Sequence, residues 1–165
     1  MGCLNCKSTN IKKKFISLYK SISYNICKDC GCHYQDPLIK YNYKEDKFWE
    51  NNQADPDGVI RNHVKEKDFK LKNWYGNTID FVNRYNNVSI LDIGCGLGFF
   101  LSAIKKNIER HGLEESKFAI DYIKKNFIDL KIFHGSYKNL PNINKKYDFI
   151  MLYHVIERSE EHTSE

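Results

Sequence analysis

Four of the six cysteines form two pairs with the same spacing near the N-terminus. Two residues separate Cys3 from Cys6 and Cys27 from Cys30, and 20 residues lie between the pairs. Two such pairs are typical of a site in which four thiolates bind one zinc ion tetrahedrally. Four protein ligands leave no open coordination position, so the spacing predicts a structural zinc rather than a catalytic one. A redox-active pair and free thiols are the alternatives.

The residues around these cysteines add three further expectations. Residues 1–37 are too few to build an apolar core, so metal binding is expected to contribute folding free energy. Cys32 and His33 follow the second pair directly and are predicted to lie just outside the site. The run Lys12–Lys14 favours a solvated strand face but leaves open a nucleic-acid-binding module.

A second group of residues has the pattern of a small-molecule site. Asp92 precedes three glycines spaced as GxGxG, at positions 94, 96 and 98, between a predicted strand and a predicted helix. Glycines there allow a sharp turn and a close approach of the backbone to a ligand. Glu114 lies twenty residues after Gly94, at the end of the next predicted strand. A carboxylate in that position can accept both hydroxyl protons of a ribose.

Strands and helices alternate from Val88 onward, which predicts parallel βαβ units and an α/β fold. Ligands of such sheets bind at the carboxyl ends of the strands, where the glycine turn is expected. The pattern predicts strands over 88–93, 108–114, 130–133 and 147–153, and helices over 97–107 and 116–126.

The chain separates by composition into four segments: a cysteine module (1–37), a connector (38–87), an α/β segment (88–157) and a short tail (158–165). The connector carries a predicted helix from about residue 67 to 85. It also carries four aromatic residues that either form a lid over a ligand or pack in the core: Tyr41, Tyr43, Phe48 and Trp49.

The segment LDIGCGLG (91–98), the acidic second strand end and the segment YDFIMLYHVIE (147–157) together resemble the class I S-adenosylmethionine-dependent methyltransferases. The leading CxxC…CxxC module resembles the zinc ribbon of a subset of that family. The resemblance implies a Rossmann-like class I methyltransferase fold with an incomplete sheet, preceded by a small zinc-ribbon module.

The resemblance also implies roles for individual residues. The glycine loop would line the methionine and ribose parts of the cofactor, and Glu114 would hold the ribose. Cys95 is expected to be a small turn residue rather than a nucleophile. Ser136 stands where the family often has an acidic residue near the adenine. The cofactor-binding residues are thus expected to be Asp92, Gly94, Cys95, Gly96, Gly98, Glu114 and Ser136.

The implied reaction is in-line transfer of a methyl group from a sulfonium to an acceptor nucleophile, with the protein supplying orientation and exclusion of water. No catalytic residue is identified; His154 is a candidate general base. A small molecule or a sugar intermediate is the expected acceptor, with RNA second. The alternatives are a non-catalytic zinc-ribbon module that binds nucleic acid, and a nicotinamide-dependent oxidoreductase. The latter is disfavoured because Phe99 occupies the third glycine position of GxGxxG.

The formal net charge of +5 permits an anionic partner without requiring one. No apolar run approaches 18 residues and no signal peptide is recognised, so a cytoplasmic protein without a membrane span is expected. The tail Arg158–Glu165 resembles the translation of a sequencing adapter and is left out of the site. Because only four strands are predicted where the family has seven, this chain is expected to bind the cofactor weakly and to lack turnover.

Overall fold

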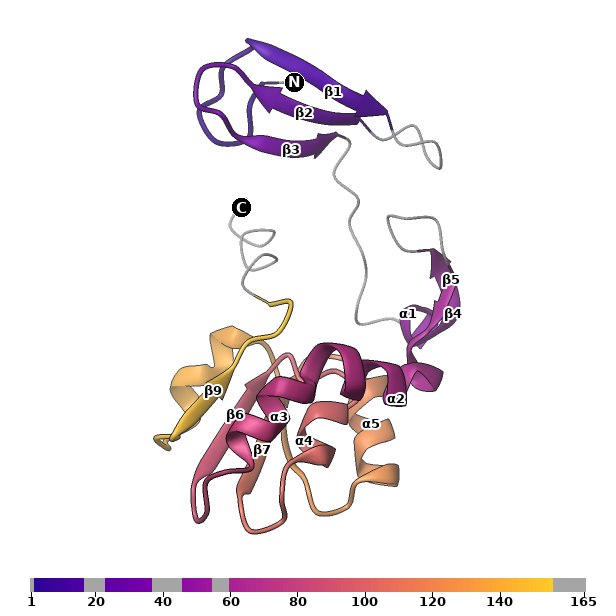
Figure 1. Ribbon diagram of the computed structural model, residues 1–165, viewed down its shortest axis with the longest axis vertical. Helices are drawn as coiled ribbons and strands as arrows, with labels where there is room; N and C mark the ends of the chain where they lie inside the picture. Colours follow the sequence, from indigo (N-terminus) through magenta and orange to yellow (C-terminus); the bar gives the residue numbers. More distant parts are fainter. Residues whose placement is uncertain (1, 17–22, 37–45, 55–59, 156–165) are drawn as a thin grey trace. The chain divides into compact units, whose positions relative to one another are not determined.

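The computed structural model describes residues 2–16, 23–36, 46–54 and 60–155. The chain divides into two compact units, residues 1–42 with 51–61 and residues 43–50 with 62–165 (Figure 1). Tyr41 and Tyr43 of the predicted lid and the tail 158–165 lie outside the described residues.

The N-terminal module is a three-stranded antiparallel sheet. Strands β1 (Ile11–Ile16), β2 (Ser23–Cys27) and β3 (His33–Asp36) pair in the order β1-β2-β3. Ile11 is opposite Cys27 and Ile26 is opposite His33, so both turns that carry a cysteine pair lie at the same end of the sheet.

The connector contains short elements. Helix α1 (Asp46–Trp49) leads into the two-stranded ribbon β4 (Glu50–Ala54) and β5 (Ile60–Asn62). A helical run follows: η1 (His63–Glu66), α2 (Lys67–Lys70), the π-helical turn η2 (Leu71–Tyr75) and α3 (Gly76–Val82). The helix predicted over 67–85 is therefore present, but it is interrupted by a π turn and ends at Val82.

The second unit is built on a parallel sheet of four strands in the order β8-β7-β6-β9. The glycine loop follows the central strand β6. The strands are β6 (Ser89–Ile93), β7 (Glu109–Glu114), β8 (Lys131–His134) and β9 (Phe149–Met151), and the connecting helices are α4 (Phe99–Ala103), α5 (Lys117–Asn126) and η3 (Tyr137–Asn142).

The predicted helix over 97–107 was too long, because α4 ends at Ala103. Ile104 has extended backbone angles and is buried beside Ile108 in the core. The guanidinium of Arg110 donates a hydrogen bond of 3.2 Å to the Ile104 carbonyl, which satisfies an acceptor at the helix end. Burial of an apolar side chain thus ends the helix one turn early.

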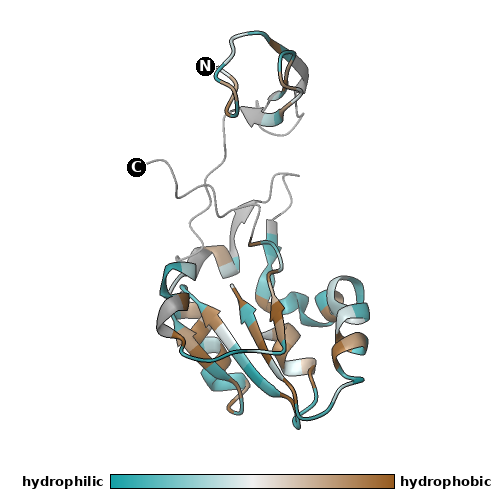
Figure 2. Cartoon of the chain, turned by 90° about the vertical axis from the view of Figure 1, so that its left-hand side faces the viewer, coloured by the Kyte–Doolittle hydropathy of each residue, from teal (hydrophilic) through white to brown (hydrophobic). Residues whose placement is uncertain are grey.

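The core lies on both faces of the sheet, since every residue of β6 is buried. One apolar cluster joins Ile90 to residues of α4 and α5 such as Leu101 and Ile123. On the other face, Leu91 and Leu113 pack in a separate cluster. Figure 2 shows the hydrophobic residues on the strands and on the helices of this unit. Among the described residues, no helix has the length and apolar character needed to cross a bilayer.

Asp148, directly before β9, is hydrogen-bonded to Ser89 at the start of β6. Because this contact needs an ionised carboxylate, the stability of the second unit is expected to fall at low pH. The Ser89 backbone N–H and hydroxyl each donate a 2.8 Å hydrogen bond to Oδ2 of Asp148. These bonds lower the pKa of Asp148, the backbone bond most strongly. Because the folded pKa is depressed, the stabilisation is complete above the unfolded pKa near 3.8 and is lost as pH falls through the folded pKa. The Asp148→Asn variant should therefore lose less stability than the wild type between about pH 5 and pH 3.

Thermal unfolding at several pH values measures this difference. Asp121→Asn, at an exposed position in α5, is the matched control and should follow the wild type. If the thermal midpoints of Asp148→Asn and wild type fall equally as the pH is lowered, the Asp148–Ser89 contact does not contribute to the acid sensitivity.

Candidate functional site

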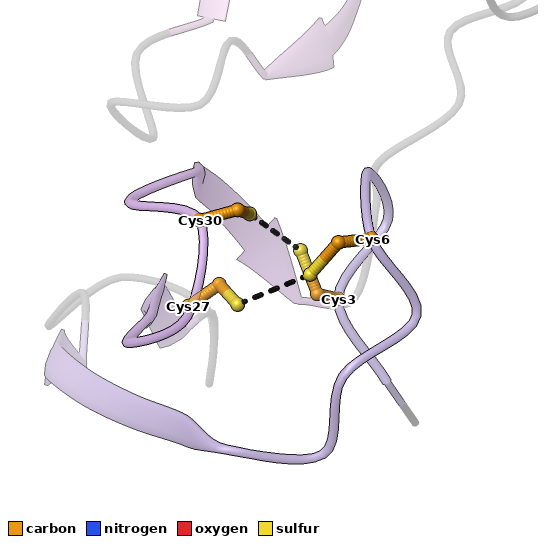
Figure 3. A group of neighbouring side chains, drawn as sticks. All are labelled: Cys3, Cys6, Cys27 and Cys30. Carbon is orange, nitrogen blue, oxygen red and sulfur yellow. Dashed lines mark hydrogen bonds between the residues drawn. The ribbon is translucent and has the colours of Figure 1, made fainter.

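The four paired cysteines converge at one point of the N-terminal module. Their Sγ atoms all lie within 4.8 Å of one another, and the Cys3–Cys30 and Cys6–Cys27 sulfur distances are both 3.6 Å (Figure 3). Tetrahedral zinc with Zn–S bonds of about 2.3 Å separates its sulfurs by about 3.8 Å. The four cysteines can therefore hold a metal ion with little movement.

Tight backbone turns set the direction of these side chains. The Cys3 N–H bonds to the Ser8 carbonyl at 2.7 Å, and the Cys27 N–H bonds to the Cys32 carbonyl at 2.9 Å. A backbone hydrogen bond from Cys6 lowers the pKa of Cys3, whereas contacts with the Cys30 and Cys27 thiols raise the pKa of Cys6 to about 12. Lys7 and Gly31, each directly after a cysteine pair, both have left-handed φ angles, 63° and 73°. The two turns therefore repeat one geometry.

Asp29, inside the second pair, ties the two turns together. Its carboxylate accepts a 2.7 Å hydrogen bond from the Asn10 side-chain amide and another from the Ser8 hydroxyl. The hydrogen bond from Ser8 is the main reason that the pKa of Asp29 is lowered. Neither Cys32 nor His33 belongs to the four-sulfur group.

The glycine loop of the second unit follows β6 at the carboxyl end of the sheet. Gly94, Gly96 and Gly98 have φ angles of 70°, 53° and 72°, a conformation that side chains with a Cβ rarely adopt. The Gly94 N–H bonds at 2.8 Å to the carbonyl of Leu113 in β7. The loop is thereby held against the end of the neighbouring strand.

The carboxylate of Glu114 is bonded to the backbone around it. Its Oε2 accepts a 2.8 Å hydrogen bond from the Gly96 N–H, and its Oε1 accepts bonds of 2.9 and 2.8 Å from the N–H groups of Glu115 and Ser116. Burial raises the pKa of Glu114, and these backbone hydrogen bonds oppose the rise. A carboxylate has about four lone-pair positions, so three are in use and one remains.

Trp49 of α1 packs on the same loop. Its indole Nε1 donates a 2.9 Å hydrogen bond to the Ser116 hydroxyl, which also caps α5. A Cβ atom built on Gly96 would lie 3.3 Å from the Trp49 ring. Trp49 is buried in a cluster with Leu97 and Phe99, so of the two readings of this aromatic residue the structure favours core packing.

The side chains of Asp92 and Cys95 are both buried at the start of the loop. Asp92 is 4% exposed, and within the described part of the chain no hydrogen bond to its carboxylate is found. Burial, and secondly the charge of Glu114, raise the pKa of Asp92. Burial also raises the pKa of the Cys95 thiol, and its sulfur fills the space above Gly112, 2.6 Å from where a Cβ would stand. Cys95 therefore packs as a neutral thiol.

Burial of the Asp92 carboxyl group is expected to destabilise the second unit, and replacement by the neutral amide of asparagine should remove this effect. Because the folded pKa of Asp92 is raised, the second unit loses stability as pH rises from the unfolded pKa through the folded one, and the deficit persists above it. Asp92→Asn should therefore raise the thermal midpoint at pH 8 by several degrees, about 1 kcal/mol, and by less at pH 5. Thermal scans at both pH values test this, with Asp121→Asn as the exposed control. An equal or lower midpoint at pH 8 would contradict it.

Ser136 and His154, the remaining candidates, follow β8 and β9. The Ser136 side chain accepts a 3.2 Å hydrogen bond from the Lys138 N–H and caps η3 in a capping box with Asn139. His154 is exposed and has a left-handed φ of 57°. Sequence reasoning missed Tyr75, which lies in the π turn and packs, partly buried, against Phe100 with ring centroids 5.6 Å apart. Burial, then the charge of Asp92, raise its pKa, so it lies near the start of the glycine loop.

Comparison with known proteins gives one family match. Residues 90–164 match a family model described as a methyltransferase domain. No curated protein matches the chain.

Several solved structures are similar to part of the chain. They include the plantazolicin methyltransferase BpumL in complex with a monoazolic desmethylPZN analog and SAH (27% identity, 55% of this chain, 40% of that chain, TM-score 0.42). A putative S-adenosyl-L-methionine-dependent methyltransferase from Methanococcus maripaludis is 22% identical (58% of this chain, 50% of that chain, TM-score 0.44). YcgJ from Bacillus subtilis is 20% identical (48% and 37%, TM-score 0.41).

The chain thus spans half or less of the length of these structures. The family match begins inside β6 and includes the glycine loop, Glu114 and β9. The parallel strand order with connecting helices agrees with the fold expected from the sequence. The chain thus carries a four-cysteine module and a parallel α/β sheet, and its residues 90–164 are similar to a methyltransferase domain.

Proposed function

We propose that the glycine loop binds S-adenosylmethionine and that the site belongs to a methyltransferase with a small-molecule or sugar acceptor. The observation that carries the proposal is the joint geometry of the loop and Glu114. The loop leaves β6 with three left-handed glycines, and the carboxylate at the end of β7 lies within hydrogen-bond distance of the Gly96 N–H, at 2.8 Å. The match of residues 90–164 to a methyltransferase domain supports the same assignment.

When bound, the sulfonium cofactor supplies an activated methyl group; the residues around it bind and orient. Glu114 has one lone-pair position left on Oε2, which suits one ribose hydroxyl. Accepting the second hydroxyl requires Oε2 to release the Gly96 N–H. Asp92, buried beside the loop without a described hydrogen bond, suits the positively charged amino group of a methionine moiety. The glycine loop and Trp49 exclude water from the Glu114 side of the site.

We also propose that Cys3, Cys6, Cys27 and Cys30 bind a structural zinc ion. Their sulfur separations match a tetrahedral four-thiolate site. With four protein ligands, the ion would stabilise the module and take no part in methyl transfer.

Calorimetric titration with S-adenosylhomocysteine up to millimolar concentration tests the cofactor proposal. Saturable binding is expected, and Gly96→Ala should weaken it about tenfold, because a Cβ there is strained at positive φ and presses on the Trp49 ring. Gly76→Ala is the matched control, since its Cβ would meet only an ordinary contact at 3.5 Å. Absence of saturable binding by the wild type, or equal binding by both variants, would count against the assignment.

A further inference from the structure

The end of the parallel sheet opposite the glycine loop is formed by four segments of the second unit. All four strands run in one direction, so the residues that precede β6, β7, β8 and β9 lie at their common amino end. These segments are residues 83–88, 104–108, 124–130 and 143–148. The turns before β6, β7 and β8 lie together at the lower end of the unit in Figure 1. Three strand spacings, about 15 Å, separate the two outer segments.

Basic side chains gather at this end of the sheet, which we term the basic end. Six of them are exposed and have no ion pair within the described part of the chain: Arg84, Lys105, Lys106, Lys124, Lys125 and Lys146. The acidic side chains of the basic end are already bonded within the unit, in the pairs Glu109–Lys145, Asp129–Arg110 and Asp148–Ser89. The surface therefore carries an excess of positive charge, which attracts an anionic partner.

Hydrogen bonds between asparagine side chains and neighbouring segments hold the basic end in place. The side-chain amide of Asn83 donates a 3.3 Å hydrogen bond to the Ala103 carbonyl, and its Oδ1 accepts one of 2.9 Å from the Lys105 N–H. The Asn107 side-chain amide donates a 2.8 Å bond to Oδ1 of Asn86. The segments before β6 and β7 are thus joined, and Lys105 extends from a backbone that is fixed at its N–H.

One aliphatic side chain projects from the basic end. Ile128, in the turn between α5 and β8, is 90% exposed, the highest value among the large hydrophobic residues that the structure describes. Lys124 and Lys125 precede it in the last turn of α5. An isoleucine cannot stack on a nucleic-acid base, as the aromatic residues of single-strand-binding surfaces do. It gains free energy on entry into hydrocarbon, so a surface of lysines around an exposed isoleucine favours a lipid partner.

We propose that the basic end docks on an anionic membrane surface, with Ile128 entering the boundary between headgroups and acyl chains and the six basic side chains facing the lipid headgroups. Each basic residue near an anionic leaflet strengthens binding about fivefold, within a Debye length of about 8–10 Å. The glycine loop lies at the other end of the strands, and β7 alone, with six residues, extends about 20 Å. Docking therefore leaves that loop facing solution, and the inference does not depend on the cofactor assignment.

Sedimentation with lipid vesicles tests the docking surface on the full zinc-loaded chain. The wild type should bind vesicles of phosphatidylcholine with about 30% phosphatidylserine and should not bind phosphatidylcholine alone. Lys124→Gln with Lys125→Gln should weaken binding about 25-fold, and Ile128→Ser about fivefold. Lys72→Gln with Lys117→Gln is the matched control, because both lysines are exposed outside the four segments, and it should bind as the wild type does. Equal thermal midpoints show that the variants are folded.

A single-stranded RNA oligonucleotide, used in the same assay, separates the two classes of anionic partner. If RNA binds with the same dependence on Lys124 and Lys125 while the vesicles do not bind, the membrane proposal is wrong and the basic end is a nucleic-acid surface. Equal sedimentation of the wild type and the Lys124→Gln, Lys125→Gln variant also overturns it, since other lysines of the chain would then account for the binding. An unchanged affinity of Ile128→Ser contradicts the insertion of that side chain.

Discussion

Removal of zinc from the four-cysteine site is expected to unfold the sheet β1–β3, with loss of the dispersed amide NMR signals of residues 11–36. Among the module residues whose burial the structure describes, only Cys3, Asn25 and Cys27 are buried. These residues therefore provide almost no apolar core, and metal ligation is expected to supply most of the folding free energy of the module. Structural zinc sites in small domains contribute about 10–16 kcal/mol at neutral pH, far more than such a module can obtain from burial.

The measurement is a set of amide spectra with zinc, with a chelator, and with zinc restored. Cys27→Ser should reproduce the chelated state, whereas Cys32→Ser is the matched control and should keep the folded spectrum, because Cys32 lies outside the four-sulfur group. The signals of β6–β8 in the second unit serve as an internal reference. Dispersed signals for residues 11–36 in the chelated protein would contradict the zinc proposal.

Replacement of Glu114 is expected to damage the second unit and the cofactor site together. Glu114→Ala leaves the N–H groups of Gly96, Glu115 and Ser116 without their acceptor. Each buried donor left unsatisfied costs about 1–3 kcal/mol, so a total loss of about 3 kcal/mol and a fall of about 10 °C in thermal midpoint are expected. Binding of S-adenosylhomocysteine should fall below detection, because the ribose loses its acceptor as well.

Glu114→Gln separates the two roles of this side chain. Its amide oxygen can still accept from the N–H groups of Glu115 and Ser116, but its NH₂ group meets the Gly96 N–H as a second donor. An intermediate midpoint with lost ligand binding is therefore expected. Glu109→Gln, at an exposed position that begins the same strand, is the control and should bind as the wild type does. Unchanged midpoint and binding in Glu114→Ala would show that the carboxylate neither anchors the loop nor meets the ligand.

The features that were predictable from the sequence depend on short separations along the chain. The two cysteine pairs each lie on one turn, and the glycines of the loop lie within five residues of one another. Local spacing of this kind determines which backbone conformations are allowed, so the strand, loop and helix around Asp92 follow from it. The parallel order of β6 and β7 follows from the connecting helix between them.

The predictions from the sequence that were wrong or incomplete concern contacts between residues that are distant along the chain. The hydrogen bond from Trp49 to Ser116 joins residues 67 positions apart, and no local pattern shows which aromatic residue of the connector reaches the loop. The length of α4 depended on burial of Ile104 against Ile108, and the π turn before Gly76 has no signature in composition. The role of Glu114 also changed, because the backbone around it occupies three of its four acceptor positions.

The sequence alone therefore determined the two groups of residues, four cysteines that can hold a metal ion and a glycine loop with a carboxylate at the next strand end. It could do so because each depends on residue types at fixed short spacings. Only the tertiary structure decided that Trp49 packs on the loop, that Asp92 is buried without a described hydrogen bond, and that Trp74 and His154 share one face. Those relations depend on the packing of the connector helices and strand ends on the sheet, which is settled by the sum of many weak apolar contacts across the whole unit.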